Sequence, residues 1–274
     1  TKIYKVMALK INVIVREDEK SLNVSKSLCE LALQKGFLID EVNPDFVFSV
    51  GGDGTFLKAV HRYLTKVKHI KFVGIHTGSL GFFADFRPED INNLLDNIIK
   101  EELNTNAYRL VKAEITQNNK KRNFYAVNEV RIENVHHTLV LDVYLNDEHL
   151  EMYRGNGVLV ATQLGSTGYN KSIGGAVINR NLELLEYTKI APIANSAFRP
   201  LVNPLIIGEK DVLVFNGKNA NTYFGYDAFT KKLSDIPFSV KVSLSNKKIT
   251  IVHRQNRPYS RILNESFLGG KHDI

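Results

Sequence analysis

Three glycines and one carboxylate stand together in the pentapeptide Gly51-Gly52-Asp53-Gly54-Thr55, directly after the apolar residues 46–50. Glycines let the backbone approach a phosphate chain without Cβ clashes, and the amides at the start of a following helix point at the anion. A carboxylate in such a cradle repels its ligand unless it holds a metal or accepts a proton. Asp53 therefore indicates Mg²⁺ binding or a general base in phosphoryl transfer. The alternative is a β-turn in which Asp53 caps the helix and Thr55 lies in its first turn.

A second glycine-rich segment, Gly-Ile-His-Thr-Gly-Ser-Leu-Gly-Phe, covers residues 74–82 and also follows an apolar run. Ligands of open α/β sheets bind outside the carboxyl ends of the strands, so two such loops after successive strands could face one crevice. His76 has no Cys or His partner at metal-site spacing, which favours a structural role. Composition alone favours a place in the hydrophobic core for the side chains of Phe82 and Phe83, rather than a role as a stacking surface.

A third segment combines glycines with hydroxyl groups and one aromatic ring. It comprises Gly155, Asn156 and Gly157, then Thr162, Gly165, Ser166, Thr167, Gly168 and Tyr169, and ends at Gly174-Gly175. Small residues allow close approach, and hydroxyl groups hydrogen-bond to sugars and ring nitrogens, so the segment suits a bound sugar and base. Hairpin loops of a β domain collect the same residue types, so a structural role stays open.

Strand-like and helix-like segments alternate through the first hundred residues and must position the first two loops. Apolar runs of strand length cover residues 9–15, 46–50 and 71–75, and helical spacing covers residues 21–35, 55–65 and 88–100. This alternation predicts a parallel sheet covered by helices on both faces. We expect an α/β domain over residues 1–104.

The sequence pattern changes after residue 105. Short segments in which apolar and polar residues alternate, separated by polar turns, predict a mainly β domain over residues 105–254. The expected strands cover residues 110–116, 124–133, 138–145, 157–162, 211–215, 240–244 and 248–253. One helix-like segment lies near residues 182–189, and the basic cluster 120–122 falls in an expected hairpin turn. The polar tail, residues 255–274, could lie back on the first domain or fray.

Length, charge and cysteine content narrow the class of protein. The 274 residues carry 36 Lys and Arg against 29 Asp and Glu, a net charge of +7 that favours anionic partners such as nucleotides. The basic residues are dispersed, so nucleic-acid binding is not expected. Cys29 is the single cysteine, which fits a reducing, cytoplasmic compartment. No apolar run approaches the roughly 18 residues of a membrane span, and no signal peptide is recognisable.

Together and in this order, the segments resemble the NAD kinases. The resemblance extends over essentially the whole chain and rests on GGDGT, GIHTGSLGFF with Asp85, the pair Asn128-Glu129, the GSTGY stretch at 165–169, and the later Gly-Gly. GGDG alone is shared with diacylglycerol, sphingosine and phosphofructokinase-type kinases, whereas the combination is far more specific. The resemblance implies an α/β N-terminal domain and a β-sandwich-like C-terminal domain with the site between them.

The same resemblance implies transfer of a phosphoryl group from ATP, or in some cases polyphosphate, to the adenosine-ribose 2′-hydroxyl of NAD. Mg²⁺ and a homodimer or homotetramer are implied as well. Asp53 matches the catalytic carboxylate near that hydroxyl, and Asn128 and Glu129 match a pair that holds NAD through its ribose. Thr167 and Tyr169 match positions that line the adenine, and Phe82 matches one that packs beside NAD. The remaining expected nucleotide contacts are Gly51, Gly52, Gly54, Thr55, Asn156, Thr162, Ser166, Ala191, Phe198 and Asp227.

Several positions depart from the family pattern. Asn156 stands where Asp is usual in a loop that contacts the nicotinamide end, and Gln163 and Gly168 replace the usual Pro and Ala. Asp227 lacks the glycine that often follows it. Asn can still pair with a carboxamide, but without the charge. Two alternatives therefore stay open: a lipid or sphingoid kinase, which needs an apolar acyl pocket and no Asn-Glu pair, and a non-catalytic nucleotide-binding protein.

Overall fold

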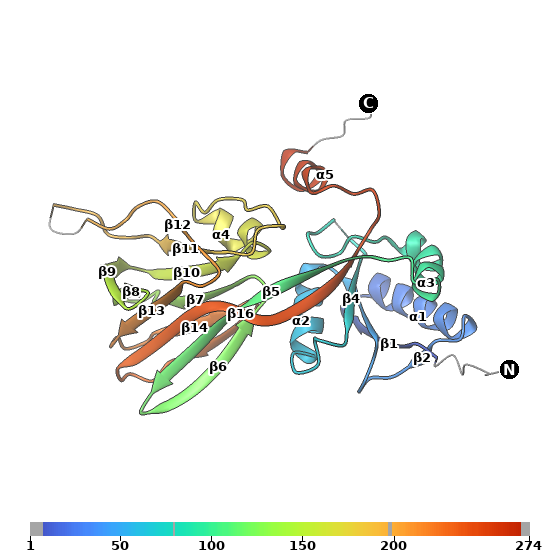
Figure 1. Ribbon diagram of the computed structural model, residues 1–274, viewed down its shortest axis with the longest axis horizontal. Coiled ribbons are helices and arrows are strands. Elements are labelled where there is room, and N and C mark those ends of the chain that lie inside the picture. Colours follow the sequence, from blue (N-terminus) through green and yellow to red (C-terminus); the bar gives the residue numbers. More distant parts are fainter. Residues whose placement is uncertain (1–7, 79, 197–198, 270–274) are drawn as a thin grey trace. The chain divides into compact units, whose positions relative to one another are not determined.

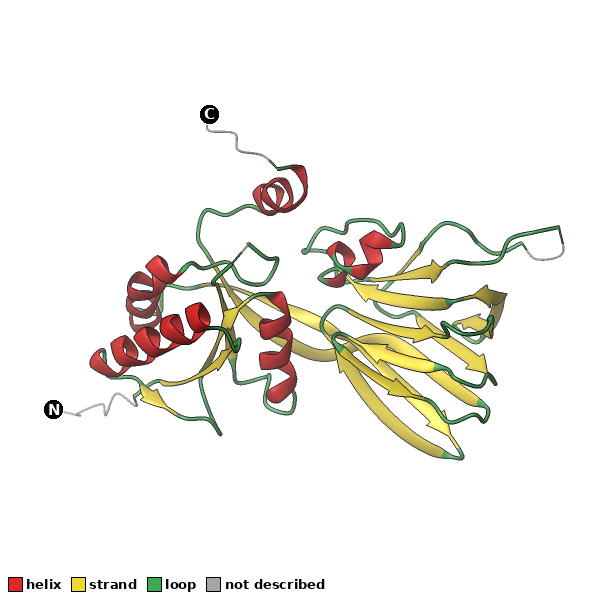
Figure 2. Cartoon of the chain, turned by 180° about the vertical axis from the view of Figure 1, so that it is seen from behind, coloured by secondary structure: helices red, strands yellow, loops and turns green. Residues whose placement is uncertain are grey.

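The computed structural model describes residues 8–78, 80–196 and 199–269, and the chain divides into two compact units (Figure 1). The first unit comprises Thr1–Tyr108 and Lys248–Ile274, and the second comprises Arg109–Lys247. Residues 248–254, which the sequence analysis gives to the second domain, belong to the first unit because they pair with its sheet. The expected fold class, an α/β domain with a parallel sheet followed by a mainly β domain, is confirmed (Figure 2).

The first unit is built on a parallel sheet with helices on both faces. Its strands are, in spatial order, β2 (Leu38–Ile39), β1 (Lys10–Val15), β3 (Phe46–Gly51), β4 (Lys71–His76) and the end of β16 (Phe238–His253). Its helices are α1 (Glu19–Gln34), α2 (Asp53–Arg62) and α3 (Ile91–Ile99), with a 3₁₀ turn η1 (Pro88–Asp90) before α3. Phe46, Phe48 and Val50 of β3 share a core with α1 and α3. Because strand side chains alternate, α2 packs on the other face, where Phe56 meets Phe72.

Two antiparallel sheets of the second unit enclose a single apolar core. One has the order β12 (Leu205–Ile207), β11 (Leu185–Ile190), β10 (Gly157–Thr162), β7 (Glu129–Glu133), β14 (Tyr223–Tyr226) and β15 (Phe229–Lys232). The other has β6 (Lys120–Ala126), β5 (Asn104–Gln117), β16, β13 (Val212–Gly217), β8 (Leu139–Leu145) and β9 (Glu148–Gly155). Val158 and Val160 point into the core, so alternate residues of β10 and β7 face the opposite side. That outer face carries the polar groups described below.

Three expectations about secondary structure are wrong. Residues 182–189 do not form a helix: β11 occupies 185–190 and pairs with β10 and β12. Its outer face buries polar groups, Glu186 and Thr188, which hid the two-residue alternation. The stretch 124–133 is two strands, β6 and β7, in different sheets. The basic cluster 120–122 lies in β6, because the turn falls at Asn118 and Asn119, both with positive φ.

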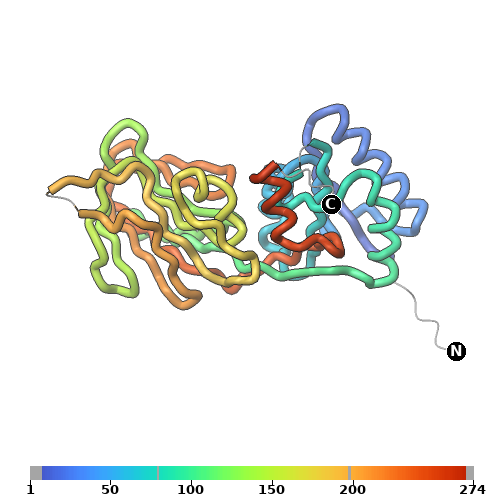
Figure 3. The backbone as a smooth tube through the Cα atoms, turned by 90° about the horizontal axis from the view of Figure 1, so that it is seen from above, coloured from blue at the N-terminus to red at the C-terminus, as the bar shows by residue number. Residues whose placement is uncertain are grey.

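The C-terminal segment returns to the first unit (Figure 3). It contains α5 (Tyr259–Leu263), which Pro258 precedes, and a π-helical turn η3 (Asn264–Leu268) that ends at Gly269 in the left-handed region. Phe267 of this turn packs against Phe82 with ring centroids 5.2 Å apart. Within the described ranges, no helix is both long enough and apolar enough to cross a membrane.

Candidate active site

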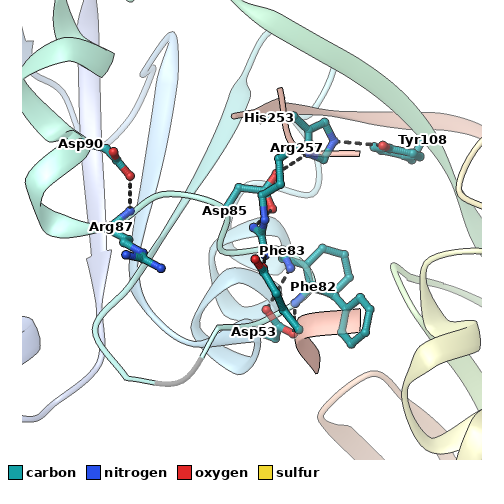
Figure 4. Close-up of polar contacts among 10 residues, drawn as sticks. Asp53, Phe82, Phe83, Asp85, Arg87, Asp90, Tyr108, His253 and Arg257 are labelled. Carbon is teal, nitrogen blue, oxygen red and sulfur yellow. Dashed lines mark hydrogen bonds and ion pairs between the residues drawn. The ribbon is translucent and has the colours of Figure 1, made fainter. Parts of the chain in front are cut away.

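Asp53 is fixed by the loop that follows β4 (Figure 4). Its two carboxylate oxygens accept hydrogen bonds from the backbone N–H groups of Phe82, at 2.8 Å, and Phe83, at 3.0 Å. Asp53 is the first residue of α2, and Gly52 occupies the N-cap position with no side-chain cap. The alternative that Asp53 caps the helix is therefore wrong. Its carboxylate instead joins the two glycine-rich loops.

The glycines of these loops make that junction possible. A Cβ on Gly81 would lie 2.2 Å from the Asp53 carboxylate, and a Cβ on Gly51 would lie 2.4 Å from the Thr55 hydroxyl oxygen. Both distances are too short for real contacts. A Cβ on Gly52 or Gly54, by contrast, would meet no atom within 4 Å other than those of the adjacent residues and of the same helix backbone. The space beside Asp53 is thus open at these two glycines, whereas buried Thr55 packs beneath the loop.

The two phenylalanines after Gly81 have different environments. Phe83 is buried and stacks on Phe56 with ring centroids 4.9 Å apart, as expected for a core residue. Phe82 is only partly buried and contacts Phe267. Composition alone favoured the core for both rings, and this holds only for Phe83. Phe82 can present part of its ring beside Asp53, and the family resemblance implies that this position packs beside NAD.

In the second unit, Glu129 and Arg131 form a buried ion pair on the outer face of β7. The carboxylate lies 2.7 Å from the Arg131 guanidinium, which also contacts Glu133 at 3.2 Å and donates to the carbonyl of Asp227 at 3.0 Å. Burial, followed by the charge of Asp227, raises the pKa of Glu129 to about 7 although Arg131 lowers it. A Cβ on Gly225 would lie 2.6 Å from the guanidinium, so this glycine leaves the space that Arg131 fills.

Tyr169 lies over this ion pair. It begins the short helix α4 (Tyr169–Ser172), its side chain remains exposed, and the Arg131 guanidinium lies 5.8 Å from its ring centroid. An exposed ring next to a cation and a buried carboxylate can stack a planar heterocycle and bind its sugar. Arg131 was missed by the sequence analysis. Its signal was the alternation of Glu129, Arg131 and Glu133 along one face of a strand, a pattern too short to be distinctive.

Three residues expected to contact the nucleotide make hydrogen bonds to the protein backbone. The Thr162 hydroxyl donates to the Val127 carbonyl at 2.6 Å and accepts the Leu164 N–H at 3.1 Å. Asp227 accepts the N–H groups of Val127, at 2.9 Å, and Asn128, at 2.7 Å. Ser166 donates to the carbonyl of Gln163 and accepts the Ile178 N–H. These three residues are buried and shape the backbone before β7 and after β10.

The backbone of Asn128 is held by the residues just described. Its backbone N–H is bound by Asp227, its carbonyl accepts the N–H of Thr162 at 2.8 Å, and Gly165 packs against its backbone. The buried side-chain oxygen of Asn128 has no hydrogen-bond partner among the described residues. A buried polar atom without a partner is unusual in a native protein and indicates a missing donor. Thr167 lies nearby in the 3₁₀ turn η2 (Gly165–Thr167), partly buried.

Asn156 lies at an exposed turn between the buried Gly155 and Gly157. Its N–H donates to the Ile190 carbonyl at 3.1 Å, and its own carbonyl accepts the Asn134 N–H at 2.8 Å. Its φ is not positive, so this turn does not need the left-handed conformation that Asn tolerates. Ala191 does have a positive φ of 46° and packs its carbonyl against Gly155. Phe198 lies outside the described residues.

Comparisons with known proteins agree with this arrangement. Residues 39–103 match the ATP-NAD kinase N-terminal domain family, and residues 127–253 match the ATP-NAD kinase C-terminal domain family. An NAD kinase of Lactobacillus gasseri is 34% identical over 266 residues, covering 95% of this chain and 98% of that protein. NAD kinase 1 of Bacillus anthracis is 33% identical over 266 residues, covering 96% of this chain and 100% of that protein.

Two solved structures share the fold. Yeast NADH kinase complexed with NADH superposes with a TM-score of 0.85 at 17% identity, covering 97% of this chain and 89% of that chain. An NAD kinase from Archaeoglobus fulgidus in complex with ATP gives a TM-score of 0.74 at 21% identity, covering 93% and 98%. With both domain families matched and relatives identical at one residue in three over nearly the full length, this chain belongs to the NAD kinase family.

Proposed function

We propose that this protein phosphorylates the 2′-hydroxyl of the adenosine ribose of NAD, using ATP or inorganic polyphosphate as the donor and Mg²⁺ as the metal. The observation that carries the proposal is the fixed carboxylate of Asp53 beside the open glycines Gly52 and Gly54. The names of the relatives and of the two solved complexes, with NADH and with ATP, support the same substrates.

The proposed phosphoryl transfer requires little covalent catalysis by the protein. Phosphoryl transfer depends on in-line positioning and on stabilising charge, and a general base contributes about 10²- to 10⁴-fold. Each Asp53 oxygen accepts one backbone N–H and keeps lone-pair capacity for the proton of a hydroxyl group. Asp53 would orient the 2′-hydroxyl and take its proton, while the amides of Gly52, Gly54 and the start of α2 bind phosphate oxygens.

The second unit would bind the nucleoside part of NAD. Glu129 would accept hydrogen bonds from ribose hydroxyl groups, and the unpartnered oxygen of Asn128 would accept another. The exposed ring of Tyr169 offers a stacking surface for adenine, with Thr167 beside it. Asn156, exposed at its turn, would meet the nicotinamide carboxamide.

Among the residues that the structure describes, no group of three His, Cys, Asp or Glu side chains could hold an ion. Mg²⁺ is commonly bound through one or two carboxylates together with substrate phosphates, so it would enter with the phosphates of the donor. When bound, it neutralises the charge on the transferred group. We place the enzyme in the cytoplasm as a homodimer or homotetramer, on the family resemblance and the single cysteine.

Purified protein incubated with NAD, ATP and Mg²⁺ tests the proposal, with NADP detected by an NADP-specific dehydrogenase. That readout requires phosphate on the 2′-hydroxyl. Polyphosphate in place of ATP, and NADH in place of NAD, define the donor and the acceptor. Phosphorylation of diacylglycerol or sphingosine without NADP would indicate a lipid kinase. NAD binding without turnover would indicate a non-catalytic nucleotide-binding protein.

A further inference from the structure

Asp85 is a buried carboxylate four residues after Gly81; one of its oxygens contacts His253, the last residue of β16, and the other contacts Arg257 in the C-terminal segment (Figure 4). The Arg257 guanidinium donates to one oxygen at 2.7 Å, and the Nδ1 atom of His253 lies 2.7 Å from the other. Asp85 is 2% exposed, and the side chain of Arg257 is 7% exposed. The loop is therefore attached to a segment more than 160 residues further along the chain.

The C-terminal segment also contains an ion pair of its own. A second guanidinium nitrogen of Arg257 lies 3.2 Å from Glu265, in the same π-helical turn as Phe267. His253 contacts the Tyr108 hydroxyl through its Nε2 atom at 2.9 Å. Arg257 thus joins Asp85 to the turn that carries Phe267, and Phe267 packs on Phe82. The segment meets the loop at two points.

One of those points is the side chain of Phe82, whose own amide holds Asp53, and the other is Asp85, two residues beyond Phe83. Going along the loop, the Phe82 ring meets Phe267, the amides of Phe82 and Phe83 bind Asp53, and Asp85 binds Arg257. A displacement at Asp85 would move these amides, because only two bonded residues separate Asp85 from Phe82. Replacing a buried ion pair by well-packed apolar residues is often neutral for stability, so net stability alone does not explain this pair.

We propose that the C-terminal segment from Arg257 to Phe267 positions the Asp53 carboxylate for phosphoryl transfer, with Asp85 and Arg257 as positioning residues. The inference rests on the function proposed above for Asp53. None of these residues needs to touch a substrate. They act by holding the loop whose amides fix the carboxylate, and a misplacement of about 1 Å at such a site can cost about 10²-fold in rate.

Arg257→Gln tests the proposal, with Arg254→Gln as the matched control. Arg254 lies three residues before Arg257 and outside the proposed segment; it pairs with Asp90 at 3.4 Å, and its side chain is 44% exposed. We expect Arg257→Gln to lower kcat about tenfold or more while KM values change much less, as positioning effects on the chemical step do. Arg257→Lys keeps the charge and should recover part of the loss. Arg254→Gln should match the wild type.

Amide hydrogen exchange supplies a readout besides activity. Arg257→Gln should accelerate exchange at Phe82 and Phe83, the amides bound by Asp53, and Arg254→Gln should not. In combination with Asp53→Asn, Arg257→Gln should cause little further loss of kcat, because both changes disable the same group. If Arg257→Gln fails to fold, Phe267→Ala replaces it, since this ring is 37% exposed and its removal spares the ion pair. Phe267→Ala should likewise accelerate exchange at Phe82 and lower kcat.

Two outcomes overturn the inference: a folded Arg257→Gln protein with the kcat of Arg254→Gln, or an undiminished loss of kcat on the Asp53→Asn background. Wild-type protein that makes no NADP, or an Asp53→Asn protein with full turnover, would instead contradict the proposed function. The two failures are therefore distinguishable in one set of assays.

Discussion

The Asp53 carboxylate accepts the backbone N–H of Phe82 at 2.8 Å, which links the glycine-rich loop after β3 to the one after β4. The two residues are 29 positions apart in the chain. A carboxylate buried in a turn would simply satisfy local amides, but this one bridges two loops and lies beside open space at Gly52 and Gly54. Asp53 therefore has an anchoring role, and the open space beside it is what its proposed role as a reacting group requires.

Asp53→Asn should reduce kcat by about 10²-fold or more, because Asn keeps the size but cannot accept a proton. The side-chain NH₂ group would also face a backbone N–H, so one of the two loop hydrogen bonds is lost, at about 1 to 3 kcal/mol of unfolding free energy. NAD affinity should change little. Steady-state kinetics, NAD titration and thermal unfolding check these values.

Asp90→Asn is the control, because Asp90 also accepts a backbone N–H, from Arg87 at 2.8 Å, at the start of a helix in the same unit. It should lose stability without losing kcat. Near-normal turnover of Asp53→Asn would leave Asp53 as an anchor between the loops and nothing more.

Glu129→Gln should change how stability depends on pH. The pKa of Glu129 is raised from 4.5 to about 7 by burial and by Asp227, so folding favours its protonated form. This contribution is fully present below about pH 4.5 and is lost as the pH rises through about 7, a difference of about 3 kcal/mol. The wild type should therefore lose unfolding free energy relative to Glu129→Gln between these values and run parallel to it above them.

Urea unfolding of both proteins across this range measures the difference, with Glu133→Gln as the control. Glu133 also pairs with Arg131, at 3.2 Å, but is more exposed. A constant gap between the wild type and Glu129→Gln at every pH would show that Glu129 does not titrate in this window.

At a pH above the raised pKa of Glu129, where its carboxyl is ionised, Glu129→Gln should also weaken NAD binding by about 1 to 3 kcal/mol, because charge-assisted hydrogen bonds to the ribose become neutral ones. Glu129→Ala should weaken it further. ATP affinity should be nearly unchanged in both variants, and calorimetric titration with each nucleotide measures this. Equal losses for NAD and ATP would instead point to disruption of β7, in which Glu129 holds Arg131.

Thr162→Val should destabilise the second unit rather than remove a substrate contact. The hydroxyl donates to Val127 and accepts the N–H of Leu164, and it is fully buried. Valine has the same shape but leaves these groups unpaired, at about 1 to 3 kcal/mol of unfolding free energy. Thr162→Ser should restore most of it. A loss of NAD affinity in Thr162→Val with unchanged stability would return Thr162 to the binding site.

Local patterns were sufficient to predict much of the fold. The α/β alternation of the first unit was predictable because its parallel strands are buried on both faces. Such strands appear in the sequence as short continuous apolar runs, between longer segments with helical spacing. The expected helix at 182–189 failed because Glu186 and Thr188 are polar yet buried, bound to Ala176 and Asn170. Polar residues on a covered face remove the contrast between inside and outside on which alternation depends.

The candidate site was predictable only where one short motif carries it. Asp53 and the glycines around it are contiguous, so their chemistry is visible in the sequence. Arg131 and the contact of Asp85 with Arg257 depend on pairings that no local spacing encodes, the latter across 172 residues. The hydrogen bonds of the Thr162 and Ser166 hydroxyl groups to backbone groups of other residues were not predictable for the same reason. A hydroxyl group in a motif does not reveal its partner.

Asn156 is where the chain departs from its family, and its exposure makes the test clean. Asn156→Leu at an exposed turn should change the unfolding free energy by no more than about 0.5 kcal/mol, so any effect on NAD reports binding. If the side chain meets the carboxamide, Asn156→Leu should cost about 1 to 3 kcal/mol of NAD affinity. Asn156→Asp should leave affinity unchanged or improve it by at most about 1.5 kcal/mol. Titration of the three proteins with NAD decides: equal affinities would remove Asn156 from the site and leave it only its hydrogen bonds to Ile190 and Asn134, which include one from its side-chain amide to the Asn134 carbonyl.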